Sequence, residues 1–266
     1  MVRSIIGAAA LAVLASGSIA SGQTLASANF ASYADGALVG QNGWVQYNTQ
    51  GTSPIQVVGG RVVWAGNGAP GSTINGQDAM LSFGQVISQP SEGTTVLHFD
   101  MLLSISSAGT APSYFAALNT LDTTSTSGNF QNVRMVAQSS GSGFVFGTRV
   151  NGQGGYPFAY GSTVLDFGTT YALRAEINLV AGNANDFIRL YVGDSFSNLT
   201  LHATAGYGSG SVTDISVGAM LLSQFANATN FESGVSMQSM SVYVVPAPGA
   251  LALLGAAGLA SRRRRR

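Results

Sequence analysis

The sequence has no cysteine and no lysine, and only 8% of its 266 residues are charged. Without cysteine there can be no disulfide bond, thiolate nucleophile or cysteine metal site, and two histidines are too few for a three-histidine zinc centre. The 11 basic residues are all arginine, they are balanced by 11 acidic residues, and five of them end the chain. We therefore expect no nucleic-acid binding, because no excess positive charge is present to neutralise phosphates.

Hydrophobic residues make up 45% of the chain, and 35 residues are glycine. This composition is typical of a globular protein whose surface consists of Ser, Thr, Asn, Gln and Gly rather than charged residues. No motif in the sequence names a reaction or a ligand.

Residues 1–20 have the pattern of a secretory signal peptide: an early positive charge at Arg3, an apolar run, and small residues up to Ala20. The alternative is a short N-terminal anchor helix, but the apolar run is shorter than the roughly 20 residues that a membrane span needs. We predict cleavage after Ala20, with a cut after Ala28 as the weaker option.

Residues 245–266 contain three consecutive segments of different chemical character. A proline pair, which should end the last strand, precedes an apolar stretch over residues 250–260 and a final arginine cluster. The apolar stretch is expected to form a short hydrophobic helix that enters the membrane transiently, with the arginines on the cytoplasmic side. The candidate sorting residues are Pro246, Pro248, Arg262, Arg263, Arg264, Arg265 and Arg266.

This tail resembles the PEP-CTERM sorting signal of bacteria that make exopolysaccharide. The resemblance covers about the last 22 residues and departs from the usual motif at Ala247, where a glutamate normally stands between the prolines. It implies processing by an exosortase-type membrane enzyme and a location in the cell envelope, at the cell surface or in the extracellular matrix. The alternative is a simple tail anchor.

The segment between the two ends, residues 21–244, has a suitable length for a single all-β domain. Without the terminal segments it keeps five arginines against 11 acidic residues, a net charge near −6. This charge favours solubility outside the cell and argues against anionic partners.

Strict alternation of apolar residues over 96–105 and 171–179 predicts strands with one buried face. Similar strands, separated by clusters of turn residues, are expected over 55–58, 61–64, 79–83, 114–118, 133–138, 144–150, 187–192, 215–222 and 235–244. About twelve antiparallel strands without a propeller-length repeat predict an all-β, two-sheet sandwich of the jelly-roll type.

The segment from Phe30 to Trp44 is similar to the first strand and turn of secreted bacterial concanavalin A-like (laminin-G-like) jelly rolls. Residues 171–178 and 188–194 resemble two adjacent strands late in that domain. The resemblance covers about a quarter of the body. It implies the jelly-roll fold, with Phe30, Tyr33 and Trp44 covering one edge of the core.

We expect no enzymatic activity. Glycan-cleaving members of this fold class carry alternating carboxylates on one strand, whereas Asp100 here is followed by apolar residues. No Gly-x-Ser-x-Gly elbow is present. His98 and His202 are expected to be half-buried strand residues, and the segment Asn198–Thr200 is expected to lie in a loop.

The best binding candidate is the glycine-rich loop over residues 151–161. Aromatic rings stack on the apolar faces of sugars while amide side chains bind their hydroxyl groups, so such a loop suits carbohydrate. The candidate carbohydrate-binding residues are Asn151, Tyr156, Phe158 and Tyr160. The alternative is that the aromatics only attach a long loop to the sandwich. Trp44 and Trp64 are expected to cover the core or its edge.

No cofactor is expected. A structural calcium ion remains an option, because Asp186, Asp194 and the nearby Asn183 or Asn185 could supply oxygen ligands, although their spacing matches no calcium loop.

Taken together, the sequence predicts an exported, surface-sorted bacterial β-sandwich that is a structural or carbohydrate-binding component of the envelope or exopolysaccharide matrix. The expected partners are the processing enzyme, an extracellular polysaccharide and, through the tail, the membrane. Two alternatives stay open: a glycan-cleaving enzyme, and a purely structural surface protein without a ligand.

Overall fold

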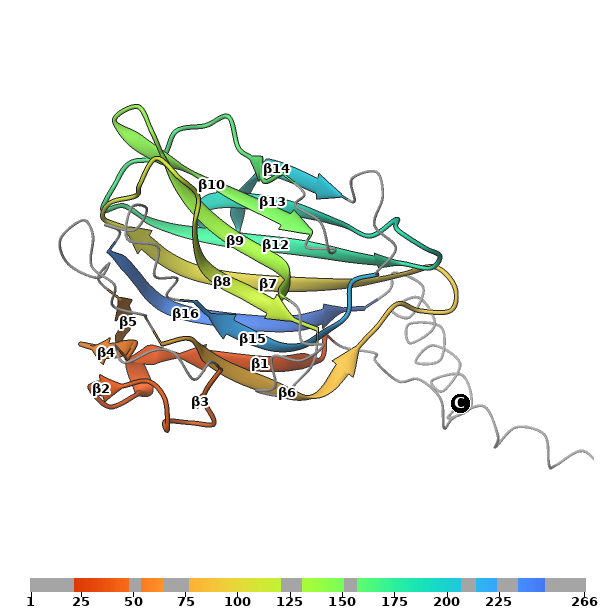
Figure 1. The fold of residues 1–266 in the computed structure, drawn as a ribbon, viewed down its shortest axis with the longest axis horizontal. Helices are drawn as coiled ribbons and strands as arrows, with labels where there is room; N and C mark the ends of the chain where they lie inside the picture. The colour runs from red at the N-terminus through yellow and green to blue at the C-terminus, as the bar shows by residue number, and fades with distance from the viewer. Residues whose placement is uncertain are drawn as a thin grey trace, which may run out of the picture.

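A computed structural model describes residues 22–47, 54–64, 77–120, 131–150, 157–206, 214–223 and 234–246. These residues form sixteen strands in two antiparallel sheets that stack as a sandwich (Figure 1). The expected all-β, two-sheet architecture is therefore confirmed, with more strands than the predicted twelve. Within these ranges, no helix is long and apolar enough to cross a membrane.

The nine-stranded sheet contains the longest strands of the chain. Its order is β14 (Asn198–Gly206), β13 (Phe187–Ser195), β12 (Thr170–Val180), β7 (Thr94–Ile105), β16 (Val235–Val245), β5 (Arg61–Trp64), β4 (Gln56–Val58) and β2 (Gly36–Ala37). The ninth strand, β1 (Thr24–Asn29), pairs with the C-terminal half of β16, beyond the part of β16 that pairs with β5.

The seven-stranded sheet lies in front of the nine-stranded sheet in the view of Figure 1. Its order is β11 (Ala159–Tyr160), β10 (Gly143–Val150), β9 (Gln131–Ser140), β8 (Ser113–Asn119), β15 (Val217–Leu222), β6 (Ala79–Ile87) and β3 (Val45–Gln46). A two-residue turn joins β9 to β10, and this hairpin is extended at the sheet edge by the short strand β11.

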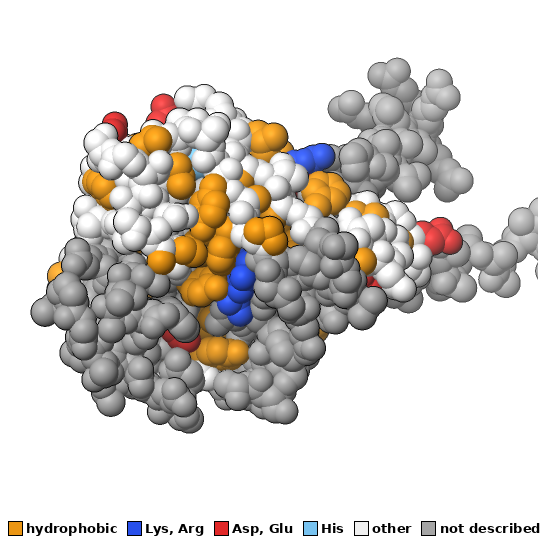
Figure 2. Space-filling view, turned by 45° about the horizontal axis from the view of Figure 1, so that its top comes forward, with side chains coloured by type: hydrophobic (Ala, Val, Ile, Leu, Met, Phe, Trp, Pro, Cys, Tyr) orange, Lys and Arg blue, Asp and Glu red, His pale blue; other side chains and the backbone are white. Residues whose placement is uncertain are grey.

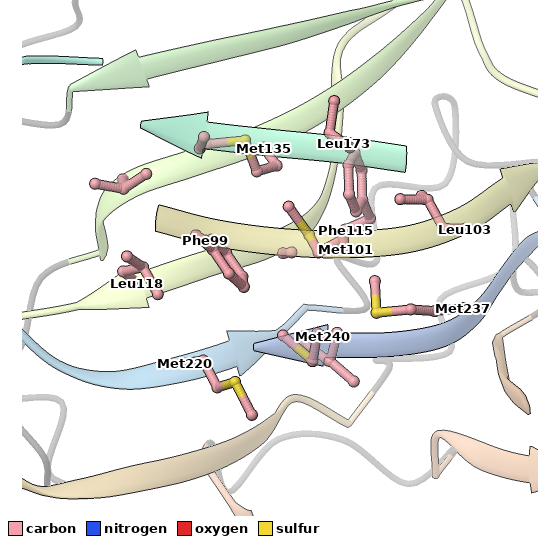
Figure 3. Close-up of a cluster of buried hydrophobic side chains, with 14 of the residues drawn as sticks. Phe99, Met101, Leu103, Phe115, Leu118, Met135, Leu173, Met220, Met237 and Met240 are labelled. Carbon is pink, nitrogen blue, oxygen red and sulfur yellow. The ribbon is translucent and has the colours of Figure 1, made fainter. Parts of the chain in front are cut away.

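The core fills the space between the two sheets. The predicted alternation in β7 is confirmed, because Phe99, Met101 and Leu103 are fully buried. Figure 3 shows these side chains beside Phe115 and Met135 from the opposite sheet. Methionine is unbranched and adapts to irregular gaps, which suits its repeated use between two twisted sheets.

The segment from Phe30 to Trp44 differs from the expected strand and turn. It begins with a short 3-10 helix, η1 (Phe30–Ser32), and the first strand is β1, which precedes it. Its predicted packing role is confirmed, because Phe30 and Trp44 are buried with ring centroids 6.2 Å apart. The side chain of Trp64 lies outside the described part of the structure.

The two ends of the sandwich meet at the β1–β16 pair. The backbone N–H of Val244 donates a hydrogen bond of 2.9 Å to the carbonyl of Gln23. Strand β16 ends at Val245, directly before Pro246, as the proline pair predicts.

Candidate binding face

The outer face of the seven-stranded sheet carries two arginines. Alternate residues of a strand belong to opposite faces of the sheet. In β9, Arg134 stands between the core residues Val133 and Met135, and in β10, Arg149 precedes the core residue Val150. Both arginines therefore lie on the outer face. In Figure 2, blue arginine atoms lie in the middle of the surface with orange hydrophobic side chains around them.

Arg134 and Arg149 are direct cross-strand partners in the β9–β10 hairpin. Like charges at opposed positions repel each other. The aromatic ring of Tyr114, from β8, lies beside both: the Cζ atoms of Arg134 and Arg149 are 4.8 and 5.8 Å from its centroid. Arg149 Nη2 also donates a 3.2 Å hydrogen bond to the Tyr114 hydroxyl. One neutral ring thus stabilises two cations through its electron-rich face.

The side chains of Arg134 and Arg149 are partly buried from solvent. Burial lowers the pKa of Arg149; the neighbouring Tyr114 opposes this shift, and the charge of Arg134 adds to it. The Nε atom of Arg134 is buried without a hydrogen-bond partner, and Arg134 makes no ion pair with any carboxylate in the described ranges. Arginine stays protonated in proteins, so Arg134 keeps its positive charge here.

Two aromatic side chains border the arginine pair. The ring centroid of Phe158 lies 4.6 Å from Arg149 Cζ and 5.6 Å from the Tyr114 ring. Tyr160, in β11, has its ring 6.0 Å from that of Phe158 and lies over Gly147, where a Cβ atom would stand only 2.6 Å from the ring. Gly147 therefore makes room for this ring against the strand.

The Tyr160 hydroxyl is a neutral hydrogen-bonding group under ordinary conditions. Burial raises the pKa of Tyr160 to about 12, the nearby Tyr114 raises it further, and Arg149 partly opposes the shift. A protonated phenol can both donate and accept a hydrogen bond. Tyr160 thus combines a ring face with a polar tip at the rim of the face.

Beyond β8 the same side of the sheet carries a second apolar cluster, whose residues are buried. This second cluster is separate from the main core and consists of Tyr47, Met80, Ala117, Ala219 and Leu221. Asn119, at the end of β8, has a buried Oδ1 atom without a hydrogen-bond partner in the described structure. The face therefore combines partly exposed rings and arginines with apolar and amide side chains that are buried.

The structure brings together half of the predicted carbohydrate-binding residues. Phe158 and Tyr160 lie side by side at the sheet edge, whereas Asn151 and Tyr156 lie outside the described residues. Both described rings pack on the sheet and both stay partly exposed. Sequence reasoning did not identify Arg134, Arg149 and Tyr114, which complete the cluster.

The outer face of the nine-stranded sheet contains a different arrangement. Arg174, in β12, donates from Nε and Nη2 to the two carboxylate oxygens of Asp100, in β7, at 2.7 Å each. Its Nη2 also donates to the Tyr243 hydroxyl at 2.9 Å, and that hydroxyl donates to Asp100 at 3.1 Å. Burial, followed by the charge of Asp100, raises the pKa of Tyr243 to about 12.

This network extends to His98, a half-buried residue of β7, as expected. Its Nδ1 atom lies 3.1 Å from the Tyr243 hydroxyl, and its Nε2 lies 3.7 Å from Glu176. Glu176 also accepts a 3.1 Å hydrogen bond from Arg189. Burial lowers the pKa of His98 below 6.5, and the charge of Arg174 adds to that effect. Each charge in this network therefore has an opposite charge beside it.

His202 is likewise half-buried in a strand, as predicted. The position where this strand begins corrects one expectation. The segment Asn198–Thr200, expected as a loop, begins β14. The imidazole of His202 occupies the space where a Cβ atom of Gly161 would stand. This contact joins β14 to the segment that follows β11, and burial lowers the pKa of His202.

The residues considered for calcium are held by other contacts. Asp186 accepts hydrogen bonds of 2.7 Å from the backbone N–H groups of Val180 and Ile215. Asp194 accepts from the Asn198 amide at 3.1 Å. The two aspartates stand at opposite ends of β13, roughly 26 Å apart along an extended chain, so they cannot share one ion. No group of three or more His, Asp or Glu suited to a metal occurs among the described residues.

Of the sorting-signal residues, only Pro246 is described, and Pro248 and Arg262 to Arg266 lie outside the described ranges. The predicted signal peptide over residues 1–20 lies outside them as well.

No protein-family model matches the chain, and no curated protein matches its sequence. Solved structures are similar to most of the chain, with TM-scores below 0.5 and low sequence identity. A carbohydrate esterase from Shiga toxin-encoding bacteriophage phi24B has a TM-score of 0.49 and 14% identity, with 85% of this chain and 100% of that chain covered.

Two further similar structures are described as a carbohydrate recognition domain and a lectin-like protein. The Emp47p carbohydrate recognition domain has a TM-score of 0.48 and 11% identity over 85% of this chain and 98% of that chain. Arcelin-5, a lectin-like defence protein from Phaseolus vulgaris, has a TM-score of 0.45 and 11% identity over 83% of this chain and 98% of that chain.

Proposed function

We propose that this chain is an exported bacterial β-sandwich protein of the concanavalin A-like type that binds carbohydrate on the outer face of its seven-stranded sheet. In this proposal it is sorted to the cell envelope or exopolysaccharide matrix by its C-terminal tail and acts there as a non-enzymatic component. The observation that carries the binding function is the cluster of Phe158, Tyr160 and Tyr114 beside polar groups on one sheet face.

The chemistry of this cluster suits a sugar ring. The C–H face of a pyranose packs on aromatic rings, and its hydroxyl groups need donors and acceptors at the ring edge. Phe158 and Tyr160 supply partly exposed rings, and the neutral Tyr160 hydroxyl supplies a group that can donate and accept a hydrogen bond. The rings are held by the sheet, which lowers the entropy that binding would cost.

The charged residues of the other face support binding rather than glycan cleavage. Glycoside hydrolysis requires two carboxyl groups across the scissile bond. Asp100 and Glu176 share the outer face of the nine-stranded sheet, but each is engaged by an arginine, Arg174 and Arg189 respectively. Carboxylates held in this way serve the stability of the sheet.

The test is saturable binding of the full chain to a panel of neutral and acidic polysaccharides, measured by calorimetry. We expect binding to at least one polysaccharide, weakened about 10-fold or more when both rings are removed in Phe158→Ala/Tyr160→Ala. Phe196→Ala is the matched control, because Phe196 is an exposed aromatic in the β13–β14 turn on the other sheet.

Each result has a definite meaning for the proposal. Binding that is lost in the double variant and kept in the control places the site on this face. Absence of binding to every polysaccharide would favour the purely structural alternative, and release of new reducing ends would favour the enzymatic alternative.

The sorting part of the proposal has a separate test. Deletion of Arg262 to Arg266 should change the distribution of the protein between cells and medium, because these arginines hold the tail at the cytoplasmic side of the membrane. Immunoblots of the two fractions measure the effect. An unchanged distribution would refute tail-dependent sorting while leaving the sugar-binding site untouched.

A further inference from the structure

We propose that His202, a residue of the nine-stranded sheet, is a positioning residue of the sugar-binding site and acts by holding Tyr160 in place. This inference rests on the proposed sugar-binding function and adds to that site a residue from the opposite sheet. The starting observation is that the imidazole of His202 packs directly against Gly161, the residue that follows Tyr160.

The edges of the two sheets meet at this point. Strand β14, which carries His202, is the terminal strand of the nine-stranded sheet, and β11, which carries Tyr160, is the terminal strand of the seven-stranded sheet. β14 contacts both β11 and β10, and Figure 1 shows it beside β10. A side chain of β14 can therefore act on the strand that carries a binding ring.

Strand β11 is held only weakly by its own pairing. It pairs with β10 at two positions, Tyr160 with Gly147 and Ala159 with Thr148, and no other strand in the described ranges pairs with it. So short a strand pair has little stability of its own. Further contacts are needed to fix the position of Tyr160.

His202 supplies such a contact through the backbone of β10. The N–H of Gly161 donates a 3.1 Å hydrogen bond to the carbonyl of Phe146. The imidazole of His202 forms a hydrogen bond with the same carbonyl, which partly opposes the lowering of the His202 pKa by burial. A backbone carbonyl has two lone pairs and can accept both bonds. The link lies next to Gly147, over which the Tyr160 ring lies.

The packing at Gly161 is as specific as the hydrogen bonds. Gly161 is buried, and a Cβ atom at this position would overlap the imidazole of His202. Tightly packed contacts of this kind leave a segment little freedom to shift. The segment at Tyr160 is therefore fixed from two sides, by β10 through Gly147 and by β14 through His202.

A fixed ring binds a sugar more tightly than a mobile one, because less entropy is lost on binding. Removal of the His202 side chain leaves a space beside Gly161 and removes one hydrogen bond to Phe146. The Tyr160 ring can then move away from Phe158, its neighbour in the binding cluster. Sugar affinity should fall although His202 itself does not contact the sugar.

The experiment measures the affinity of the full chain for laminarin, xylan, dextran and polygalacturonate by calorimetry. Variants are compared on the polysaccharide that the unmodified chain binds most tightly. We expect Tyr160→Ala and His202→Ala each to weaken binding by about 3-fold to 10-fold. His202→Gln keeps a hydrogen-bond donor and much of the volume, so it should recover most of the affinity.

The matched control is His98→Ala. His98 is the only other histidine, is also half-buried, and also has a pKa lowered by burial, but it contacts Tyr243 and Glu176 instead of the binding cluster. This variant should leave the affinity unchanged. An equal loss of affinity in His98→Ala would overturn the positioning role of His202.

A double-variant comparison separates positioning from a general loss of stability. If His202 acts through Tyr160, His202→Ala should cause no further loss of affinity in the Tyr160→Ala background. A substitution that only weakens the fold would lower affinity equally in both backgrounds, and this result would overturn the inference. Melting curves set a temperature at which every variant is folded.

A measurement without sugar separates this inference from the proposed function. Burial raises the pKa of Tyr160 to about 12. In His202→Ala, ultraviolet titration should show one more tyrosine that ionises close to the ordinary pKa of about 10, and this tyrosine should be absent from His202→Ala/Tyr160→Ala. Sugar binding with an unchanged tyrosine titration would overturn this inference alone. Absence of binding to every polysaccharide would overturn both proposals.

Discussion

The outer faces of the two sheets carry arginines in opposite surroundings. On the nine-stranded sheet, Arg174 is joined to Asp100 by two short hydrogen bonds, and Tyr243 completes the group. On the seven-stranded sheet, Arg134 faces Arg149 across the β9–β10 hairpin with the ring of Tyr114 beside them. The first arrangement contains its own counter-charge, and the second places two charges of one sign together.

This difference separates a stabilising surface from a binding surface. A charge pair with satisfied hydrogen bonds holds neighbouring strands together and leaves little capacity for a ligand. The two opposed cations of the seven-stranded face repel each other, the Tyr114 ring offsets part of that repulsion, and the partly exposed rings of Phe158 and Tyr160 lie beside them. We therefore expect substitutions on the nine-stranded face to change stability, and substitutions on the seven-stranded face to change binding.

The largest expected effect is that of Asp100→Ala. The substitution removes the two carboxylate acceptors of Arg174 and leaves a partly buried cation without its counter-charge, so the free energy of unfolding should fall by about 2–4 kcal/mol. Urea unfolding of the full chain measures the change. Glycan affinity at a temperature where the variant is folded should stay unchanged, and a parallel loss of affinity would contradict the separation of the two faces.

Gly147→Ala should affect both properties, because the new methyl group would collide with the Tyr160 ring and approach Val136. We expect a loss of about 1–3 kcal/mol in the free energy of unfolding and weaker glycan binding from the displaced ring. Gly84→Ala is a useful comparison for stability. Nothing lies near the Cβ position of Gly84, but its positive φ makes the backbone unfavourable for alanine. Only Gly147→Ala should alter binding.

Acidification should lower stability without lowering binding. The pKa values of His98 and His202 are depressed in the folded chain, so the folded state favours the neutral imidazoles. Their stabilising contribution is fully present above the unfolded pKa of about 6.5 and is lost as the pH falls towards the depressed folded values. Melting temperatures should therefore fall from pH 7 to pH 5.5, and less steeply in His98→Gln/His202→Gln.

The same pH range offers a check on the other face, because Arg134 and Arg149 stay charged throughout it. Affinity for the polysaccharide that binds should remain nearly constant between pH 7 and pH 5.5 while the melting temperature falls. Parallel changes in affinity and stability would show that the two faces are coupled.

The smallest stability effect is expected for Arg134→Gln. The lost contact with the Tyr114 ring and the relief of repulsion with Arg149 have opposite signs and similar size, so the change should stay below about 1 kcal/mol. Urea unfolding beside Asp100→Ala provides the direct comparison. A loss as large as that of Asp100→Ala would mean that Arg134 has a structural role instead.

The long central strands could be predicted from the sequence almost to the residue. The expected strands over 96–105 and 171–179 are observed as Thr94–Ile105 and Thr170–Val180. These strands have one buried face and one polar face, and such an environment imposes strict alternation. The alternation of buried and exposed positions along the strand is therefore directly visible as alternation of apolar and polar residues in the sequence.

Strands in other environments left weaker signals. In β14, Leu201 is 58% exposed while the small residues Ala203 and Ala205 point inward, so hydrophobicity does not alternate as expected for a half-buried strand. In β1, small residues dominate and a single position, Ala28, is buried. Whether these segments form strands depends on their position at the sheet edge and on the strand with which they pair. Neither can be deduced from the segment's own sequence.

The candidate site was predictable only in part, although a signal for the rest was present. Phe158 and Tyr160 stand out as aromatics in a glycine-rich segment. The arginine pair depends on the hairpin between 133–138 and 144–150, whose two-residue turn at Gly141 and Ser142 fixes which residues face each other. Interpreting that turn as a hairpin would have placed Arg134 opposite Arg149. The approach of Tyr114 requires the third strand and could not follow from local pattern.

The pairing of β16 with β1 and β7 has a consequence for the order of folding. Residue Ser27 pairs with Ser241, and β16 also forms the inner neighbour of β7, so the sheet cannot close before nearly the whole body is available. Contacts between such distant parts of a chain make folding slow. Until β16 arrives, β7 and β1 keep unpaired backbone groups that can join another chain. The interval between synthesis and closure of this sheet is thus the period in which the protein is most prone to aggregate.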